Sequence, residues 1–389
     1  MRSFLRVAFL IALLGVATAT VHAQSRFGGV DVAVRAGIAR GVYPGAVVVV
    51  GRADTILYAR GYGHFTWSHK SAVPDPENAL WDLASLSKVL GTASALAVLA
   101  ADRRVDLDAS VQTYLPEFEG TGKERVTVRM LLDHTSGLPA YAQLYRSASS
   151  AEAIARLFAV PLQRSVGTSP IYSDLNAMLA GLVIERVSGQ GLDQFAEATV
   201  FIPLGMRATR YRPADIDKVR VVPTALLRGK SISGVVNDEN ARRLNGVAGH
   251  AGLFSTGLDV ATFAQSWLRI TPLSAPWADA PTLLQFFQRT PQSGSRALGW
   301  DTPEVSATGS PSAFGKCASA STFGHTGWTG TALWIDRDAD LFVVFLTNRS
   351  YSPHTRGSSF TQLRLVRADV SDAVRRAVGA CASPLSAAD

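Results

Sequence analysis

The sequence has few of the residues and patterns that usually hold a metal ion or a nucleotide. Its 389 residues include only two cysteines and seven histidines. No His-x-x-x-His zinc pattern occurs, and no glycine-rich loop carries the lysine that would cradle a phosphate. No segment repeats at a fixed period, so a repeat architecture is not expected. We therefore expect no metal site and no cofactor.

Clustered charge is also missing. The formal net charge is +7, but the basic residues are scattered and are not interleaved with aromatic residues, so the sequence does not predict nucleic-acid binding. The composition is that of an ordinary globular protein, 47% hydrophobic and 18% charged. A net charge of this size allows a loose attraction to an anionic cell wall but indicates no specific macromolecular partner. We expect a monomer with a small-molecule or peptidoglycan-derived substrate.

Long apolar runs are absent after the N-terminal segment. Arg2 and Arg6 precede a short apolar run, and the small residues up to Ala23 are typical of a signal peptidase site. Residues 1–23 are therefore predicted to be a secretory signal peptide, and the mature chain 24–389 to be secreted or periplasmic. Because no cysteine lies near the cleavage point and no later run is long and apolar enough to cross a bilayer, we expect neither a lipid anchor nor a transmembrane anchor.

Hydrophobic periodicity predicts different secondary structure at the ends and in the middle of the chain. Each end supplies a β-hairpin and an amphipathic helix, whereas the middle is nearly all helical. The simplest architecture is an α/β (α+β) fold in one domain, with one antiparallel sheet from both chain ends, flanked by the terminal helices, and an inserted all-helical subdomain. The sheet part is roughly 24–80 plus 300–389, and the helical part is roughly 81–299. The predicted hairpin strands are 46–50, 55–59, 331–337 and 340–347. The predicted terminal helices are 28–40 and one that begins at about 361.

A serine and a lysine three residues apart begin the first helix of the middle segment. Ser85 and Lys88 are predicted to lie on one face of it, one turn apart. A serine hydroxyl needs a base to become a nucleophile, and a lysine can be that base if burial and neighbouring charge lower its pKa. Unpaired N–H groups at a helix start can stabilise an oxyanion. A single Ser-x-x-Lys match is much more often a helix cap followed by a solvated lysine, so other residues must support it.

A polar turn before a later helix supplies a second group for proton transfer. Tyr172 precedes Asp174 there, and a phenol beside a lysine can take the serine proton and deliver it to a leaving group. Taken alone, Tyr172 would more often be a tyrosine that simply packs at a helix start. Its value as a candidate therefore depends on Ser85.

A His-Thr-Gly-Trp segment precedes the last predicted hairpin. Gly327, after Thr326, lets the backbone pass close to a substrate, and the N–H of Trp328 could complete an oxyanion hole with that of Ser85. His325 could contact the substrate or the tyrosine–lysine pair, although a lone histidine is more often structural.

Together, the three motifs resemble the signature motifs of the serine β-lactamase and penicillin-binding-protein superfamily. The nearest resemblance is to its class C-like branch, which holds D-amino-acid peptidases, esterases, muramoyl amidases and β-lactamases. This resemblance implies a β-lactamase/transpeptidase-like fold and an acyl-enzyme mechanism. It assigns catalysis to Ser85, Lys88, Tyr172 and His325 and substrate binding to Asp174, Thr326, Gly327 and Trp328.

Further segments support the same resemblance. Residues 43–46, 131–139, 299–300 and 346–349 resemble the same branch. Residues 236–240 and 246–255 resemble exported muramoyl-L-alanine amidases.

Two residues depart from the pattern of the branch. The second motif has Asp174 where lactamases and peptidases usually have Asn, and a carboxylate accepts hydrogen bonds but repels anions. The third motif has His325 where those enzymes usually have Lys, and an unperturbed imidazole is mostly neutral at pH 7. Both changes weaken the case for a penicillin or a terminal D-alanine carboxylate as substrate, and they favour a neutral or differently charged ester or amide.

The resemblance also bears on the two cysteines. In an exported protein such a pair is more often bridged than free. Given the expected fold and export, we predict that Cys317 and Cys381 form a disulfide that ties the final helix to the segment before the last hairpin.

Several other polar residues are interpreted as structural. His134 and His250 lie in glycine-bearing turns. Asp238, Glu239 and Asp301 have no evident partner in the sequence, so we expect them to be solvated or to order loops.

The sequence therefore predicts an exported serine hydrolase that cleaves an ester or amide through an acyl-enzyme. The substrate would be a cell-wall-related peptide or amide, or a small ester, with weak β-lactamase activity at most. The alternative is a non-catalytic or slowly acylated penicillin-recognising sensor domain. The three intact motifs favour the enzyme, and the sequence alone does not separate esterase, amidase and peptidase.

Overall fold

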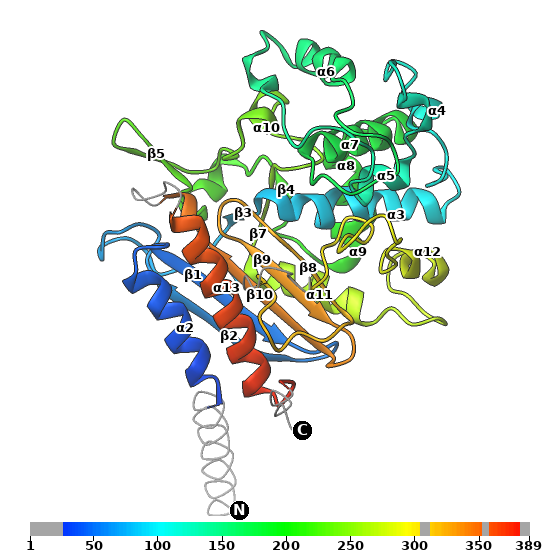
Figure 1. Ribbon diagram of the computed structural model, residues 1–389. Coiled ribbons are helices and arrows are strands. Elements are labelled where there is room, and N and C mark those ends of the chain that lie inside the picture. Colours follow the sequence, from blue (N-terminus) through cyan, green and yellow to red (C-terminus); the bar gives the residue numbers. More distant parts are fainter. Residues whose placement is uncertain (1–25, 304–311, 352–357, 382–389) are drawn as a thin grey trace, which may run out of the picture.

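A five-stranded antiparallel sheet forms the centre of the computed structural model, which describes residues 26–303, 312–351 and 358–381 (Figure 1). The predicted signal peptide, 1–23, lies outside these residues and stays a prediction. The strand order is β2-β1-β10-β9-β8. The strands are β1 (Gly45–Gly51), β2 (Ile56–Gly63), β8 (Thr322–Thr326), β9 (Ala332–Asp336) and β10 (Leu341–Thr347).

The two ends of the chain meet in this sheet, as predicted. β1 pairs with β10, so that Ala46 lies opposite Thr347. β8 was not expected as a separate strand, because the sequence analysis placed His325 at the start of the last hairpin. Instead, His325 lies opposite Leu333 on β9, one strand further towards the sheet edge. The β8 sequence Thr-Phe-Gly-His-Thr has only one large apolar residue, which is why it lacks a clear strand pattern.

Both faces of the sheet are buried. Alternate residues of β10 point to opposite sides: Val344 belongs to the main core, whereas Val343 and Phe345 belong to a separate core under the terminal helices. The helices over that second face are α2 (Gly28–Ala39) and α13 (Ser358–Ala377), which pack side by side in front of the sheet in Figure 1. The predicted terminal helices are therefore confirmed.

The other face of the sheet is covered by a helix from the middle of the chain. This helix, α11 (Gly257–Leu268), contacts β1, β9 and β10. Its start is fixed by Thr256, whose side chain accepts a hydrogen bond from the Asp259 N–H at 3.2 Å. The middle segment thus contributes one layer of the sheet core as well as the helical part.

The rest of the middle segment is mainly helical, with short strands that the sequence analysis missed. β7 lies between β3 and β4, and β5 pairs with β6. The short strands are too brief to give a period-two pattern. They are β3 (Trp81–Asp82), β4 (Arg210–Tyr211), β5 (Ala225–Leu227), β6 (Lys230–Ile232) and β7 (Leu253–Ser255), and the helices are α4 (Val111–Tyr114), α5 (Val128–Leu132), α6 (Ser150–Ala159), α7 (Asp174–Ser188), α8 (Leu192–Ala196), α9 (Ile202–Leu204), α10 (Glu239–Arg243) and α12 (Ala280–Gln285).

The helical run that carries Ser85 is irregular. It begins as a 3₁₀ turn (Ala84–Leu86), continues as a π-helix (Lys88–Ala93) and ends as α3 (Ser94–Ala101). Contrary to the sequence expectation, Ala84–Ala101 is long and apolar enough to cross a membrane by length and composition. Because 83% of this run is buried inside the protein, its apolar residues contact the core.

The predicted disulfide is present. Cys317 and Cys381 are bridged, with their Cα atoms 4.7 Å apart. The bridge joins the segment before β8 to the chain just after α13, which is the pair of segments that the sequence predicted.

Candidate active site

Ser85 and Lys88 form a direct hydrogen bond at the junction of the sheet and the helical part. The Lys88 Nζ lies 2.9 Å from the Ser85 Oγ. The chain changes from a 3₁₀ turn to a π-helix between these two residues, and their hydrogen bond shows that they still lie on one side, as predicted. Lys88 is only 4% exposed, whereas Ser85 is half-buried and reaches a cavity.

The turn before Ser85 is held by a buried carboxylate. Ala84 has a φ of 49°, which is unusual for a residue other than glycine. Its N–H donates to the Asp82 Oδ1 at 2.9 Å, and the Asn237 N–H donates to the Asp82 Oδ2 at 2.6 Å. Burial raises the pKa of Asp82 to about 6. These bonds fix the chain from β3 into the turn that presents Ser85.

The segment after His325 closes on the same turn from the other side. The Thr329 hydroxyl donates to the Asp82 carbonyl at 2.8 Å, and the Thr331 hydroxyl donates to the Leu83 carbonyl at 2.9 Å. A Cβ at Gly327 would lie 2.6 Å from the Leu83 oxygen, so only glycine fits this approach. The third motif is therefore packed directly against the segment that carries the nucleophile.

Residues 134–140 form hydrogen bonds that hold the turn carrying Tyr172 and Asp174 in place. The Asp174 N–H donates to the Ala140 carbonyl at 3.0 Å. The His134 Nδ1 accepts the Ser173 N–H at 3.2 Å. The Ser173 hydroxyl also caps α7 by accepting the Asn176 N–H. His134 thus has the structural role that its sequence position indicated.

Asp174 determines the charge state of Lys88. Its Oδ1 lies 2.7 Å from the Lys88 Nζ, which also donates to the His250 carbonyl at 3.3 Å. Burial alone would lower the pKa of Lys88, but interactions with Asp174 and Tyr172 outweigh it and raise the pKa above the ordinary value. The expectation of a lysine base with a lowered pKa is therefore wrong for this arrangement, and Lys88 is an ammonium group at neutral pH.

Tyr172 lies between two cations and two imidazoles. The Lys88 Nζ is 4.9 Å and the Arg296 guanidinium carbon 5.0 Å from the centre of its ring. The rings of His134 and His325 are centred 4.8 Å and 5.8 Å from it. Two cations therefore lie close to the Tyr172 ring, where they would favour negative charge on a nearby group.

His325 is held as a neutral imidazole. Burial lowers its pKa well below 6.5, and the nearby Lys88 and Arg296 lower it further. Its Nδ1 lies 2.9 Å from the Thr326 carbonyl, which can only accept, so the Nδ1 carries the proton. Among the residues that the structure describes, the buried Nε2 has no hydrogen-bond partner. His325 is only 3% exposed at the wall of the cavity, and its free lone pair is an acceptor.

A cavity of about 810 Å³ opens in front of these groups. Three aromatic residues on its wall are exposed: Tyr141 at 44%, Trp328 at 60% and Phe360 at 41%. Trp328 stacks on Phe360, and the buried Arg349 supports it by donating to its carbonyl at 2.6 Å. The cavity is lined by Ser85, Tyr141, Tyr172, Asp174, Asn237, Glu239, Arg242, Arg296, Asp301, His325, Thr326, Gly327, Trp328 and Phe360.

The structure thus brings all eight predicted site residues together. Seven of them line the cavity, and Lys88 lies behind Ser85. The sequence analysis missed Arg296, Tyr141 and Phe360, because no local pattern links these residues to the motifs. Asp238 also has a partner that was not foreseen, since its Oδ1 lies 2.8 Å from the His250 Nε2.

One cluster near the site has metal-ligand chemistry. The ligand atoms of Asp174, Asp238 and His250 all lie within 4.8 Å of one another. Lys88 already supplies a positive charge at Asp174, and Asp238 and His250 are hydrogen-bonded to each other. Both carboxylates thus have protein partners, and we assign no metal to this cluster.

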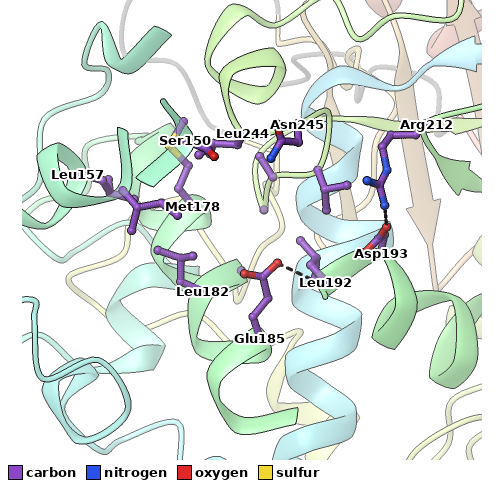
Figure 2. Close-up of a pocket in the computed structure, with 15 residues that line it drawn as sticks. Ser150, Leu157, Met178, Leu182, Glu185, Leu192, Asp193, Arg212, Leu244 and Asn245 are labelled. Atoms are coloured by element: carbon purple, nitrogen blue, oxygen red, sulfur yellow. Dashed lines mark hydrogen bonds and ion pairs between the residues drawn. The ribbon is translucent and has the colours of Figure 1, made fainter. Parts of the chain in front are cut away.

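A second cavity, of about 250 Å³, lies beside α7 and the 244–249 loop (Figure 2). Figure 2 shows mostly apolar side chains around it, including Met178 and Leu182. Its charged groups are paired: Arg212 binds Asp193, and Glu185 accepts the Leu192 N–H at 3.2 Å. Ser85, the candidate nucleophile, lines the larger cavity, so that cavity is the candidate active site.

Comparisons with known proteins agree with this geometry. A family model described as "Beta-lactamase" matches residues 30–368. The chain is 32% identical over 307 residues to a Salmonella agona (strain SL483) protein named "Putative D-alanyl-D-alanine carboxypeptidase", covering 71% of each. Its fold is similar to that of EstCE1, a hydrolase with promiscuous acyltransferase activity (TM-score 0.70, 21% identity, 90% of this chain and 100% of that one). It is also similar to a class C beta-lactamase (TM-score 0.70, 20% identity, 90% and 96%).

Proposed function

This chain belongs to the β-lactamase and penicillin-binding-protein family of serine hydrolases, and we propose that it is exported and cleaves an ester or amide through an acyl-enzyme. The observation that carries the proposal is the 2.9 Å hydrogen bond between the Lys88 Nζ and the Ser85 Oγ at the wall of the large cavity. A nucleophile, a cation, a phenol and a close glycine turn converge there, which is the set of groups that acyl transfer needs.

In the proposed acylation step, the Ser85 Oγ attacks the substrate carbonyl carbon. The serine proton passes to the Tyr172 oxygen while the phenol's own proton passes to the leaving group. The bond between the carbonyl carbon and the leaving group then breaks, which leaves an acyl ester on Ser85 and releases an alcohol or amine. This relay needs no neutral lysine, in agreement with the raised pKa of Lys88.

Lys88 and the backbone would stabilise the charge that this step creates. The Lys88 ammonium donates to the Ser85 Oγ, so it favours the developing alkoxide. We propose that the N–H groups of Ser85 and Trp328 bind the oxyanion, because the Gly327 turn packs against the chain just before Ser85. We propose that His325 remains neutral beside Tyr172 and acts as a hydrogen-bond acceptor.

Hydrolysis would complete the cycle by the reverse proton route. A water molecule attacks the acyl carbon, gives one proton to the Tyr172 oxygen, and the phenol returns its proton to the Ser85 Oγ. The acid leaves and the resting pair of Ser85 and Lys88 is restored. Asp174 keeps Lys88 protonated through both steps.

We infer that the natural substrate is a peptide or amide derived from the cell wall, or a small ester. The carboxypeptidase name of the Salmonella relative and the predicted signal peptide both support this class and a secreted or periplasmic location. Penicillin turnover should be slow beside that of an ester or amide, because Asp174 offers the substrate amide no N–H donor.

Intact-protein mass spectrometry tests the proposal. We expect one covalent adduct after incubation with a fluorophosphonate and a transient acyl adduct with a muramyl peptide, whereas penicillin should react slowly. Ser85→Ala should abolish the adducts, and turnover of a p-nitrophenyl ester should fall by several orders of magnitude. The matched control is Ser87→Ala, since the Ser87 hydroxyl is fully buried and accepts the Leu253 N–H at 3.1 Å outside the cavity.

The alternative from the sequence is a non-catalytic or slowly acylated penicillin-recognising sensor domain. A slowly acylated domain would form the same adduct without releasing it, so an adduct that persists over many hours would favour it. Absence of any adduct on the folded wild-type protein would overturn the acyl-enzyme proposal and would favour a non-catalytic binding domain.

A further inference from the structure

Segments 236–240 and 246–255 meet beside Lys88, although the proposed mechanism gives them no role. The His250 Nε2 lies 2.8 Å from the Asp238 Oδ1, and the His250 carbonyl accepts the Lys88 Nζ at 3.3 Å. We propose that Asp238 and His250 are a positioning pair for Lys88. Asp238 supplies a second counter-charge to the ammonium group, and His250 fixes both Asp238 and the carbonyl that Lys88 contacts. This inference rests on the proposed function, because it assigns to the pair the task of holding Lys88 against the nucleophile.

The position of the Lys88 ammonium group depends on three oxygen atoms. An ammonium group has three N–H donors. The Lys88 Nζ donates to the Ser85 Oγ at 2.9 Å, to the Asp174 Oδ1 at 2.7 Å and to the His250 carbonyl at 3.3 Å. Lys88 is only 4% exposed, so protein groups and not bulk water set its geometry. A shift of the His250 carbonyl would therefore move the ammonium group relative to Ser85.

The loop that carries this carbonyl is fastened on two sides. The Gly249 carbonyl, one residue earlier, accepts the Thr92 hydroxyl at 2.7 Å. The His250 side chain is 1% exposed, and among the described residues its Nδ1 has no partner, so the bond from Nε2 to Asp238 anchors the ring. The Asp238 Oδ1 also accepts the Ala241 N–H at 2.8 Å and so caps α10. The pair thus joins the start of α10 to the loop that contacts Lys88.

Two carboxylates share the charge of Lys88. The ligand atoms of Asp174, Asp238 and His250 lie within 4.8 Å of one another, and Asp174 touches the ammonium group directly. Burial alone would raise the pKa of Asp238, but His250, the Ala241 N–H and the charge of Lys88 outweigh it and lower the pKa below the ordinary value. Carboxylates this close repel each other unless a cation compensates them. Lys88 therefore compensates Asp174 by contact and Asp238 at longer range.

The other titratable groups that face Lys88 are not carboxylates. The Lys88 Nζ lies 4.9 Å from the centre of the Tyr172 phenol ring. His134 and His325 are imidazoles whose pKa is lowered by burial and by nearby cations, including Lys88. Asp174 and Asp238 are thus the carboxylates that the described contacts place near the ammonium group, and removal of either should weaken its charged form.

Nuclear magnetic resonance of Lys88 tests the second counter-charge without turnover. The protein has six lysines, so selective lysine side-chain labelling gives few signals, and Lys88→Arg identifies the signal of Lys88. Asp174→Asn protein is the background, because loss of the contact carboxylate lets burial lower the pKa of Lys88. In Asp174→Asn/Asp238→Asn the titration midpoint of Lys88 should shift further to lower pH. Asn at position 238 can still accept the Ala241 N–H, so the cap of α10 is retained.

Asp174→Asn/Asp259→Asn is the matched control. The Asp259 Oδ2 accepts the Ala208 N–H at 2.8 Å and the Thr209 hydroxyl at 2.9 Å, so this variant neutralises a partly buried carboxylate with other partners. Its Lys88 midpoint should equal that of Asp174→Asn. An unchanged midpoint in the Asp238 double variant, an equal shift in the control, or a Lys88 that stays protonated wherever the Asp238 double variant is folded would each overturn the inference.

The role of His250 is tested by the rate at which a fluorophosphonate forms its adduct on Ser85. His250→Ala should slow adduct formation by roughly 10- to 100-fold, because the carbonyl that positions Lys88 is released. His250→Gln should recover most of the rate, since its amide N–H can donate to Asp238. A wild-type rate in the Ala variant, or a Gln variant as slow as Ala, would overturn this role. Absence of an adduct on wild-type protein would instead contradict the hydrolase proposal, and the Lys88 titration would still decide the inference.

Discussion

At the scale of single residues, one carboxylate changes how the nucleophile is activated. Where the related peptidases and lactamases carry an amide, Asp174 forms an ion pair with Lys88 at 2.7 Å. The pair opposes the effect of burial and raises the pKa of Lys88. Proton transfer is then assigned to Tyr172, with Lys88 as a fixed cation. The sequence identified all three residues, but their charge states depend on distances that no motif contains.

Asp174→Asn should lower the pKa of Lys88, because it removes the ion pair that opposes the effect of burial. Without the carboxylate, burial dominates and the pKa of Lys88 falls, so the alkaline limb of kcat/KM for a p-nitrophenyl ester should move to lower pH. In the wild type, the stability from this pair is present below the unfolded pKa of about 10.4 and is lost only as the pH rises through the raised folded pKa. Asp174→Glu keeps the charge and serves as the control. A limb that does not move in the Asn variant would show that another group sets it.

His325→Gln tests whether the neutral imidazole of His325 controls activity at low pH. Since burial and two cations lower the pKa of His325, an acid limb set by this residue should lie below the usual range of histidine. Gln does not titrate, so the variant should lose this limb in kcat/KM. His325→Lys should instead increase the preference for carboxylate-bearing substrates.

Folding must be monitored in the same pH range. The unfolded chain binds a proton at His325 near pH 6.5 and the folded chain only at lower pH, so stability falls as the pH drops below that value. Circular dichroism at each pH separates unfolding from a catalytic limb. An acid limb that is unchanged in the folded Gln variant would assign it to another group.

At the scale of elements, the site depends on two segments that close on each other. The turn after β8 bonds to the carbonyls of Asp82 and Leu83 through Thr329 and Thr331. This contact sets the distance between the nucleophile and the proposed oxyanion donors. It explains why a glycine is required at position 327, far from Ser85 in sequence.

Gly327→Ala should therefore impair catalysis more than stability. The new Cβ would lie 2.6 Å from the Leu83 oxygen, so the turn must move away from the 3₁₀ turn of Ser85. A shift of this kind costs roughly 100-fold in kcat/KM, measured with the p-nitrophenyl ester. Gly28→Ala is the control, because nothing lies within 4 Å of a Cβ there. Full activity of the Ala variant at position 327 would exclude the close approach.

The elements that the sequence predicted are the ones with strong local signals. The hairpin of β1 and β2 has a valine run and a polar turn, and α2 has apolar residues at helical spacing. β8 was missed because its polar, glycine-containing sequence becomes a strand only through pairing with β9. The π-helix at Lys88–Ala93 and the contact of Arg296 with Tyr172 likewise depend on tertiary packing. The motifs thus predicted residues that the structure brings together, while the rest of the cavity lining came from the structure.

At the scale of the whole molecule, both chain ends are needed to complete one sheet. β1 from the N-terminal part pairs with β10 from the C-terminal part, and α2 packs on α13. The helical part between them supplies Tyr172 and Asp174, and the sheet edge supplies His325. Any loosening of the C-terminal segment should therefore lower the stability of the whole fold.

The disulfide between Cys317 and Cys381 should contribute to that stability without affecting the chemistry. It closes a loop of 64 residues, for which restriction of the unfolded chain corresponds to about 4 kcal/mol. α13 has 20 residues and so extends about 30 Å, and its first turn carries Phe360 at the cavity while its far end lies near the bridge. We expect Cys317→Ser/Cys381→Ser to lower the free energy of unfolding by a few kcal/mol in urea titrations, with ester turnover unchanged at temperatures where the variant is folded.

Addition of dithiothreitol to the wild type is the matching control and should reproduce the loss, whereas the variant should not respond. Equal midpoints for wild type and variant would mean that the bridge does not stabilise the fold, and a lower turnover in the folded variant would show that α13 transmits strain to the cavity.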